Sequence, residues 1–374
     1  MRPAWIEVDL AAIRHNMQLL QQHIGPHCRL MPVIKADAYG MGDIPVAEAC
    51  LQGGARAFAV ATLDEALRLR NGGISVPILI LSRLADEDIP TALQHDIMLN
   101  ACELPFAAAI SQAAEALGLT ARVHLKVDTG MSRLGLSPDE AGAAEAAAIY
   151  ALPHLEIVGI FSHFATADEP ENDFAAVQLA SFRRFCGLLQ ARGLSVPPRH
   201  MSASAACTEL KEARDFEIAR PGIIIYGVYP DEIIKGSLPV QEALQIKAKI
   251  IQTHDLAIGQ PASYGSIWRA ERPSRLATLG LGYADGYPRL LSNRAEVLVC
   301  GRRAPIRGRI CMDHLMIDIT DIPEAGVGSE VTLLGHDGAE CIDVYELSRL
   351  SSSIPHELMS RLSPRLARVY KNRI

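Results

Sequence analysis

Eight short apolar runs of the β type alternate with helical stretches between residues 30 and 220. Such alternation is typical of βα units around a parallel sheet, because parallel strands need a crossover connection. Eight units are the number that closes into a (β/α)8 barrel, whose strands are covered on both faces. The predicted fold class is therefore α/β, with a TIM-type barrel. The eight runs span residues 30–34, 57–60, 77–81, 97–99, 122–127, 156–161, 199–201 and 216–219.

Helical periodicity fills the gaps between several of these runs. The clearest start is a capping box in which Thr62 precedes Glu65 by three positions. The helices that this pattern predicts span residues 62–70, 103–116, 138–149 and 174–192.

After about residue 238 the pattern changes to alternating runs among Gly and Pro turns, and helical periods vanish. This is typical of a mostly antiparallel β domain, and the strand-like runs span residues 244–253, 295–299, 315–319 and 330–334. We therefore predict a barrel domain over residues 10–238 and a C-terminal β domain over 239–374. The extended run at residues 2–9 lies outside the eight-strand count and is expected to pair with the β domain.

Composition excludes several classes of protein. The 374 residues carry a formal net charge of -7 and are 49% hydrophobic, so the chain can build a core but has no basic field for nucleic acid or an anionic membrane. No apolar run approaches the roughly 18 residues of a membrane span. Glu7 and Asp9 stand where a signal peptide would be apolar, so we expect a cytoplasmic protein.

The eight cysteines are spread over the chain without a Cys-x-x-Cys pair or a tight Cys/His cluster at metal spacing. His23 and His27 have i,i+4 spacing, but Gly25 and Pro26 between them would break the helix that could aim both at one ion. We expect reduced thiols and no metal site.

The carboxyl ends of the predicted barrel strands carry an unusual number of polar side chains. Each alone has an ordinary structural explanation, since a lysine after a strand commonly extends along the surface into water. A barrel directs all of them into one bowl, where the chemistry of this fold is found. The set comprises Lys35, Lys126, Asp128, Arg133, His163, His200, Ser202, Ser204 and Arg220.

The loops after the seventh and eighth runs are the frequent phosphate site of such barrels. Ser204 offers a hydroxyl there, and Gly222 lets backbone N–H groups approach phosphate oxygens. Together with Lys35 at the end of the first run, this predicts pyridoxal 5'-phosphate bound as an internal aldimine, with Arg220 available to its ring nitrogen. The alternative is a phosphosugar barrel that uses the same cradle without a cofactor.

An ordered series of motifs along nearly the whole chain resembles the alanine racemase family. The stretch that resembles the cofactor-lysine motif is VIKADAYG at residues 33–40. The others are RPAWIEVDL at 2–10, HLKVDTGM at 124–131 with RLG at 133–135, HFATAD at 163–168, RPGI at 220–223, SYG at 263–265, GYADG at 282–286 and GRICMD at 308–313.

The resemblance implies a homodimer that interconverts L-alanine and D-alanine, with active sites shared between the barrel of one subunit and the β domain of the other. Inversion at the α-carbon needs proton removal on one face and return on the other. The two bases would be Lys35, which carries the aldimine, and Tyr264 of the partner subunit. A phenol is a weak base near neutral pH, so Tyr264 would need a cationic neighbour, for which His200 and Arg220 are candidates.

The remaining roles are also carried by the resemblance. The residues assigned to the cofactor are Lys35, Tyr39, Arg133, His163, His200, Ser204, Arg220, Gly222, Ile223 and His356. Those assigned to the substrate are Arg133, Met312, Tyr283, Cys311 and Asp313, while Lys126 is often carbamylated in the family and would orient Arg133. The substrate entryway would involve Tyr283, Arg289, Arg309, Asp168 and Ile354.

Three positions depart from the family pattern. Met41 stands where His is frequent, Ala203 where Asn usually precedes the serine, and His356 where Tyr is frequent. Alternatives that the residues leave open are a racemase of broader specificity that accepts serine, a pyridoxal-phosphate decarboxylase of the same fold and a cofactor-binding barrel without catalysis. A biosynthetic and a catabolic role are equally compatible with the sequence.

Overall fold

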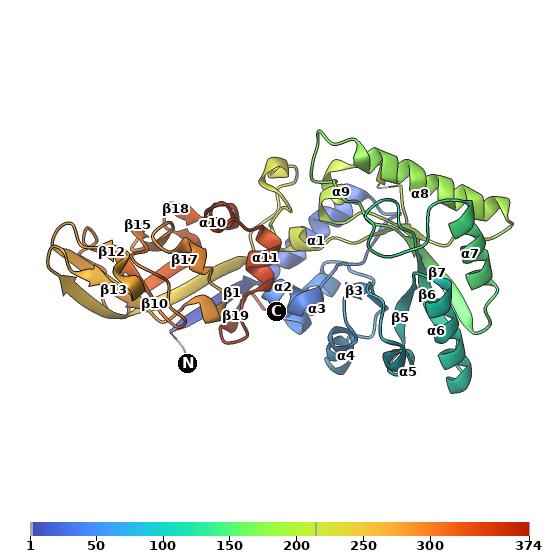
Figure 1. Cartoon of the computed structure of the whole chain (residues 1–374), viewed down its shortest axis with the longest axis horizontal. Helices are drawn as coiled ribbons and strands as arrows, with labels where there is room; N and C mark the ends of the chain where they lie inside the picture. Colours follow the sequence, from blue (N-terminus) through green and yellow to red (C-terminus); the bar gives the residue numbers. More distant parts are fainter. Residues whose placement is uncertain (1–2, 214, 374) are drawn as a thin grey trace. The chain divides into compact units, whose positions relative to one another are not determined.

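The computed structural model describes residues 3–213 and 215–373, and these form two compact units (Figure 1). The barrel unit comprises Ile13–Ala38 and Asp43–Gln241, and the C-terminal unit comprises Met1–Ala12, Tyr39–Gly42 and Glu242–Ile374. The predicted domain boundary after residue 238 stays a prediction, and Arg2 of the extended N-terminal run lies outside the described residues.

Eight parallel strands form the sheet of the barrel unit, as the sequence predicted. Their order is β2-β9-β8-β7-β6-β5-β4-β3, and the ring closes through a parallel pairing of Val33, after β2, with Ala59 in β3. Apolar side chains that include Met31, Leu79 and Met98 pack in its core. The strands are β2 (Arg29–Leu30), β3 (Phe58–Val60), β4 (Ile78–Ile80), β5 (Ile97–Ala101), β6 (Ala121–Lys126), β7 (Leu155–Phe161), β8 (Arg199–His200) and β9 (Ile218–Ala219).

Helices lie outside these strands (Figure 1). They are α1 (Leu10–Ile24), α2 (Lys35–Gly40), α3 (Asp43–Gln52), α4 (Leu63–Asn71), α5 (Ile89–Gln94), α6 (Leu104–Leu117), α7 (Glu140–Tyr150), α8 (Phe174–Ala191) and α9 (Ser204–Glu209). The four predicted helices are confirmed as α4, α6, α7 and α8. The capping box is present, because Thr62 accepts from the Glu65 N–H at 3.3 Å and Glu65 accepts from the Thr62 N–H at 3.2 Å. Within the described ranges, no helix combines the length and apolar character needed to cross a membrane.

Helix α2 is left-handed. Ala36, Asp37, Ala38 and Tyr39 have φ between 53° and 58°, and Gly40 follows with φ 82°. For residues other than glycine this conformation costs roughly 1–2 kcal/mol each, because Cβ approaches the following carbonyl oxygen. The strain is concentrated directly after Lys35, and the surrounding fold must offset it.

The C-terminal unit is mostly β, as predicted. Its main sheet has the order β15-β14-β17-β10-β1-β19, with β13, β16 and β18 attached at its side. Strand β1 (Ala4–Asp9) pairs antiparallel with β10 (Leu244–Leu256) and parallel with β19 (Ala367–Lys371). The other strands are β11 (Pro261–Ala262), β12 (Trp268–Arg269), β13 (Ser274–Leu279), β14 (Glu296–Val299), β15 (Arg302–Pro305), β16 (Leu315–Asp318), β17 (Glu330–Asp337) and β18 (Glu340–Ile342).

Helical periods vanish from the sequence after residue 238, but the structure has two short helices among the residues it describes there. The C-terminal unit contains α10 (Val344–Ser351) and α11 (Pro355–Ser360). Both are shorter than the 11 to 18 residues over which a helical period is recognised. The start of α10 is nevertheless well specified, because the Asp343 side chain caps it by accepting the Glu346 N–H at 2.8 Å.

Candidate functional site

Arg220 is the centre of a polar cluster in the barrel unit. It follows β9 and is only 2% exposed. Its guanidinium donates to Nδ1 of His200 at 2.6 Å, to the Ser162 carbonyl at 2.7 Å and to Nδ1 of His163 at 3.3 Å. Burial lowers its pKa to about 10, so it remains a cation at neutral pH. Among the described residues no carboxylate forms an ion pair with it, which leaves a buried positive charge suited to a polar ligand.

The three histidines around Arg220 are neutral, and their protons are ordered. Burial lowers the pKa of His124 to about 3 and holds those of His163 and His200 well below the usual range. Nδ1 of His200 accepts a hydrogen bond from Arg220, so the proton of the His200 imidazole is on Nε2. Nε2 of His200 lies 2.7 Å from Nδ1 of His124. Of the two cationic candidates for a neighbour of Tyr264, only Arg220 carries a charge at neutral pH. His124 is not among the predicted site residues, although it lies in one of the quoted motifs.

Lys126 lies beside this cluster at the end of β6. Its Nζ donates to the Val127 carbonyl at 2.9 Å and lies 5.2 Å from the centre of the Phe161 ring. Burial, followed by the charge of Arg220, lowers the pKa of Lys126 to about 7. A large fraction is therefore the neutral amine at neutral pH, which is the form that reacts with carbon dioxide.

Lys35 begins the left-handed α2 and is half-buried. Burial lowers its pKa, and the nearby charge of Arg133 lowers it further. The capping carboxylate of Glu65 also accepts the N–H groups of Ala36 at 2.7 Å and Ala61 at 2.8 Å. One side chain thus caps α4 and fixes the backbone next to Lys35.

Asp128 organises the loop that carries Arg133. Its carboxylate accepts the N–H groups of Gly130 at 2.9 Å, Ser132 at 3.0 Å and Arg133 at 3.1 Å. The Arg133 side chain is exposed, and its charge contributes to lowering the pKa of Lys126 as well as that of Lys35. The loop therefore adds the positive charge of Arg133 to those of Arg220, Lys126 and Lys35.

Ser204 and Gly222 meet at the predicted phosphate cradle. The Ser204 hydroxyl oxygen accepts the N–H groups of Gly222 at 2.9 Å and Ile224 at 3.3 Å, which leaves its own proton for a further acceptor. Because the Gly222 N–H is directed at Ser204, a phosphate contact from Gly222 would require that bond to be exchanged. Ile223 is buried at the start of a 3-10 turn, Ile223–Tyr226.

In the C-terminal unit, the SYG motif at residues 263–265 lies beside the GRICMD motif at residues 308–313. Tyr264 is 70% exposed and follows Ser263, whose φ is +64°. A Cβ atom at Gly308 would lie 2.7 Å from the carbonyl oxygen of Ala262 and 2.7 Å from Cβ of Ser263. A side chain at position 308 would therefore displace the loop that presents the Tyr264 phenol.

The GYADG motif at residues 282–286 contacts the GRICMD motif at residues 308–313. The N–H of Tyr283 donates to the Cys311 carbonyl, and that of Ala284 to the Met312 carbonyl, both at 3.0 Å. A Cβ atom at Gly282 would lie 2.3 Å from the same Cys311 oxygen. Tyr283 and Met312 are exposed at 40% and 53%.

Asp313 is engaged elsewhere, since its carboxylate pairs with Arg365. The structure thus brings Tyr264, Tyr283, Cys311 and Met312 together in one unit, whereas the carboxylate of Asp313 is directed at an ion pair.

Tyr39 and His356, both in the C-terminal unit, have ring centroids 6.1 Å apart. Burial raises the pKa of Tyr39 to about 12, so its phenol keeps its proton and is a hydrogen-bond donor. His356 occupies the position of a frequent family Tyr, and the structure places it beside one of the predicted phosphate ligands.

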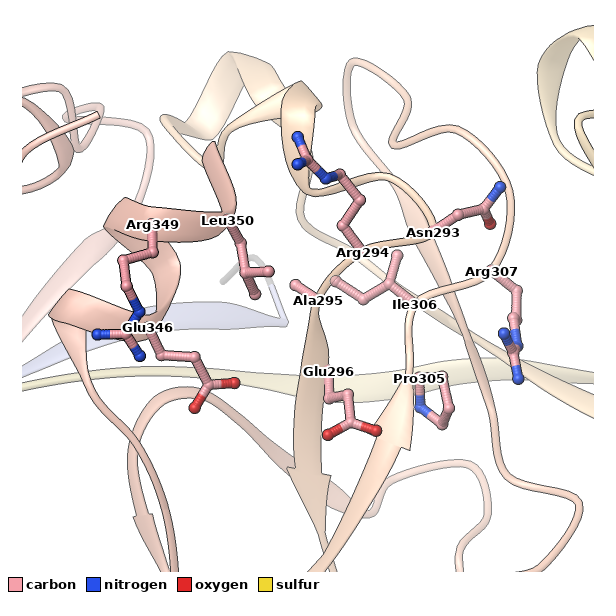
Figure 2. A pocket seen from close by; sticks show the side chains of 10 residues that line it. All are labelled: Asn293, Arg294, Ala295, Glu296, Pro305, Ile306, Arg307, Glu346, Arg349 and Leu350. Carbon is pink, nitrogen blue, oxygen red and sulfur yellow. The ribbon is translucent and has the colours of Figure 1, made fainter. Parts of the chain in front are cut away.

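The entryway residues divide between surfaces of the two units. Tyr283 and Arg289 line a hollow with the segment between α10 and α11, and Ile354 on that segment is exposed. Arg309 lies against Gly265, whereas Asp168 belongs to the barrel unit. A second hollow of the C-terminal unit, lined by Glu346 and Arg349 among others, contains none of the predicted site residues (Figure 2).

Comparison with known proteins gives matches over almost the whole chain. Residues 8–230 match the alanine racemase N-terminal domain and residues 243–370 its C-terminal domain. An alanine racemase of Desulforamulus reducens is 42% identical, covering 98% of this chain and 99% of that protein, and one of Methanococcus maripaludis is 39% identical, covering 98% of each. The crystal structure of alanine racemase from Bacillus anthracis with bound L-Ala-P has a TM-score of 0.93 at 34% identity, covering 99% of this chain and 95% of that one.

Proposed function

The chain belongs to the alanine racemase family of isomerases, and we propose that it interconverts L-alanine and D-alanine with pyridoxal 5'-phosphate in the barrel and Lys35 and Tyr264 as opposed bases. The observation that carries the proposal is the buried Arg220, a cation whose hydrogen bonds within the described residues go to neutral acceptors. It suits the nitrogen of a pyridine ring, which it would keep unprotonated.

The described side chains fit the cofactor that this family uses. When bound, pyridoxal phosphate withdraws electrons from the substrate α-carbon and so acidifies its proton. Lys35, with its lowered pKa, would attach to the aldehyde, and Arg220 would donate to the ring nitrogen. The phosphate would accept hydrogen bonds from the Ser204 hydroxyl, the Ile223 N–H and the Tyr39 phenol.

Other predicted ligands have positioning roles in this proposal. His200 and His163 hold the Arg220 guanidinium in place, because both accept its N–H groups. Arg133, oriented by Lys126, would contact the phenolic side of the cofactor or the substrate carboxylate. His356 beside Tyr39 would complete the phosphate end.

Proton movement would involve one base on each face of the α-carbon. In the L to D direction, Oη of Tyr264 takes the α-proton and Nζ of Lys35 returns a proton to the opposite face. Nδ1 of His163 accepts a hydrogen bond from Arg220, so the proton of the neutral imidazole is on Nε2. The Nε2–H group is then available to donate to the Tyr264 phenolate. In the reverse direction the two bases exchange roles.

The proposed assembly is a homodimer in which Tyr264 comes from the partner subunit. The 70% exposure of this phenol in the chain supports a role towards another molecule. Met312, exposed beside Cys311 and Tyr283, would bring its backbone N–H to the substrate carboxylate from the same side.

Complementation tests both the bases and their sharing. Lys35→Ala and Tyr264→Phe are each expected to abolish racemisation, and their co-expression to restore part of it, because one site of a mixed dimer has both bases. Absence of any restoration would contradict the shared site. A Lys35→Ala protein that still forms a borohydride-reducible cofactor link would contradict the role of Lys35.

Substrate range is tested by α-hydrogen exchange of L-alanine and L-serine in heavy water, with and without added pyridoxal phosphate. We expect cofactor-dependent exchange of alanine. Release of carbon dioxide from the amino acid would instead indicate a decarboxylase, because a racemase removes optical rotation without releasing carbon dioxide.

A further inference from the structure

Three side chains outside the proposed active site converge on the surface of the C-terminal unit. They are Glu242, His336 and Cys341, and their ligand atoms all lie within 4.8 Å of one another. A carboxylate oxygen, an imidazole nitrogen and a thiol sulphur form a donor set typical of zinc rather than of magnesium or calcium.

The β-sheet creates this cluster from distant positions. Strands β17 and β18 form a hairpin in which His336 is directly opposite Cys341, so both side chains project from the same face. Glu242 stands just before β10, whose Ile246 pairs with Leu334 of β17. The spacing along the chain resembles no local metal motif, which is why the sequence predicted no metal site.

The two distances from His336 match those of a tetrahedral zinc site, and the Glu242 and Cys341 atoms lie within 4.8 Å of each other. Zinc bonds of about 2.0–2.2 Å to nitrogen and oxygen and about 2.3 Å to sulphur put the ligands about 3.4 Å (N to O) and about 3.6 Å (N to S) apart. Nε2 of His336 lies 3.3 Å from Oε2 of Glu242 and 3.7 Å from Sγ of Cys341. The cluster therefore needs only small side-chain rotations to take up an ion.

The surroundings fix the backbone of two of the ligands. Arg303 donates to the Cys341 carbonyl at 2.7 Å, and Nζ of Lys247 lies 3.5 Å from the His336 carbonyl. The side chains of Glu242 and His336 are partly exposed, at 39% and 58%, so an ion can enter from solvent with a water as fourth ligand. One carboxylate and one thiolate would neutralise the charge of Zn²⁺.

We propose that Glu242, His336 and Cys341 form a zinc site with three protein ligands and one water. On binding, Zn–S, Zn–N and Zn–O bonds replace the bonds to all but one of the waters of the hydrated ion, and the thiol proton leaves to solvent. The ion links the residue before β10 to the β17–β18 hairpin, and it stabilises the folded chain because the unfolded chain does not hold these three ligands together.

The test uses the full-length holoenzyme without an affinity tag, dialysed against chelator and titrated with zinc against a fluorescent zinc indicator. Co²⁺ is a second probe, since a thiolate ligand gives a charge-transfer band and four-coordination gives intense visible bands. We expect one equivalent of zinc in the wild-type protein and at least tenfold weaker binding in Cys341→Ser and His336→Gln. The matched control is Cys300→Ser, which changes an exposed cysteine of the same unit outside the cluster.

Circular dichroism checks that each variant is folded, and alanine racemisation should be unchanged in all three variants. Zinc should raise the melting temperature of the wild-type protein and of Cys300→Ser but not that of Cys341→Ser. The proposal is overturned if the wild-type protein binds zinc no more tightly than the Cys341→Ser and His336→Gln variants, or if Cys300→Ser removes the cobalt charge-transfer band.

Discussion

Nη1 of Arg220 donates a 2.6 Å hydrogen bond to Nδ1 of His200. A guanidinium only donates, so this bond fixes the proton of neutral His200 on Nε2 and makes His124 an acceptor at Nδ1. One buried cation thereby orders the protons of His200 in β8 and His124 in β6, the strands on either side of β7.

The packing around His124 gives the first prediction. A Cβ atom at Gly159 would lie 2.1 Å from Nδ1 of His124, so Gly159→Ala must displace the ring from His200. We expect the free energy of unfolding to fall by about 1–3 kcal/mol, as in other overpacked cores, and racemisation to slow. Denaturant unfolding and initial rates measure the two effects.

The matched control for that variant is Gly187→Ala in α8, where an added Cβ meets no atom within 4 Å. This change should raise the free energy of unfolding by roughly 0.5–1 kcal/mol, because alanine is the better helix former. Equal stability of Gly159→Ala and the unmodified chain would contradict the close contact with His124.

Lys126 predicts a pH dependence of stability. Its pKa is about 7 in the folded chain against 10.5 for the free side chain, so between these values the unfolded chain binds more protons. The contribution of Lys126 to the free energy of unfolding therefore rises with pH from about 7 to 10.5 and is lost as the pH falls through that range.

Lys126→Met removes this titration. The variant should gain most over the wild-type protein at pH 7 and below, and the gain should shrink as the pH rises. Urea unfolding over this range, in buffers free of carbon dioxide, measures the difference, and identical pH profiles would contradict the lowered pKa.

Because α2 is left-handed, an alanine-to-glycine substitution should affect stability differently in α2 than in a right-handed helix. Ala36 is exposed with φ 54°, so Ala36→Gly removes strain of roughly 1 kcal/mol and loses little packing. Ala144→Gly, at an exposed position within the right-handed α7, should instead destabilise by about 1 kcal/mol. Thermal unfolding of the Ala36→Gly and Ala144→Gly variants measures the difference. Destabilisation of the same size in both variants would rule out a strained turn at α2.

Glu65 should matter beyond its helix cap. In Glu65→Gln one carboxylate oxygen becomes an amide group that faces N–H donors, either at Ala36 or at Ala61 and Thr62. We expect a loss of about 1–2 kcal/mol in the free energy of unfolding and weaker cofactor retention. Asp64→Asn, an exposed change in the same helical turn, is the control and should be nearly neutral in both measurements.

Local patterns were sufficient to predict most of the barrel. Most barrel strands coincide with short apolar runs, such as Phe58–Val60 and Ile78–Ile80, and the Thr62 and Glu65 pair marked the start of α4. The family resemblance and the barrel geometry together predicted the cluster around Lys35 and Arg220. The individual roles of those residues stay predictions.

Features that depend on tertiary structure could not be predicted in the same way. The left-handed turn of α2 is formed by Ala36, Asp37, Ala38 and Tyr39, and none of these is a glycine that would signal such a turn in the sequence. Only the folded surroundings account for the left-handed conformation. The ordering of His124 by His200 depends on side chains 76 residues apart. The zinc ligands are likewise brought together by strand pairing.

The pairing of β2 with β9, and of β1 with β19, has a consequence for synthesis on the ribosome. Strand β2 leaves the ribosome early, but its neighbour β9 follows only when the rest of the barrel has been translated. Strand β1 can pair only later still, because its neighbour β19 lies close to residue 374. A nascent chain released early would therefore expose the unpaired edge of β2 in the barrel unit and the unpaired edge of β1 in the C-terminal unit.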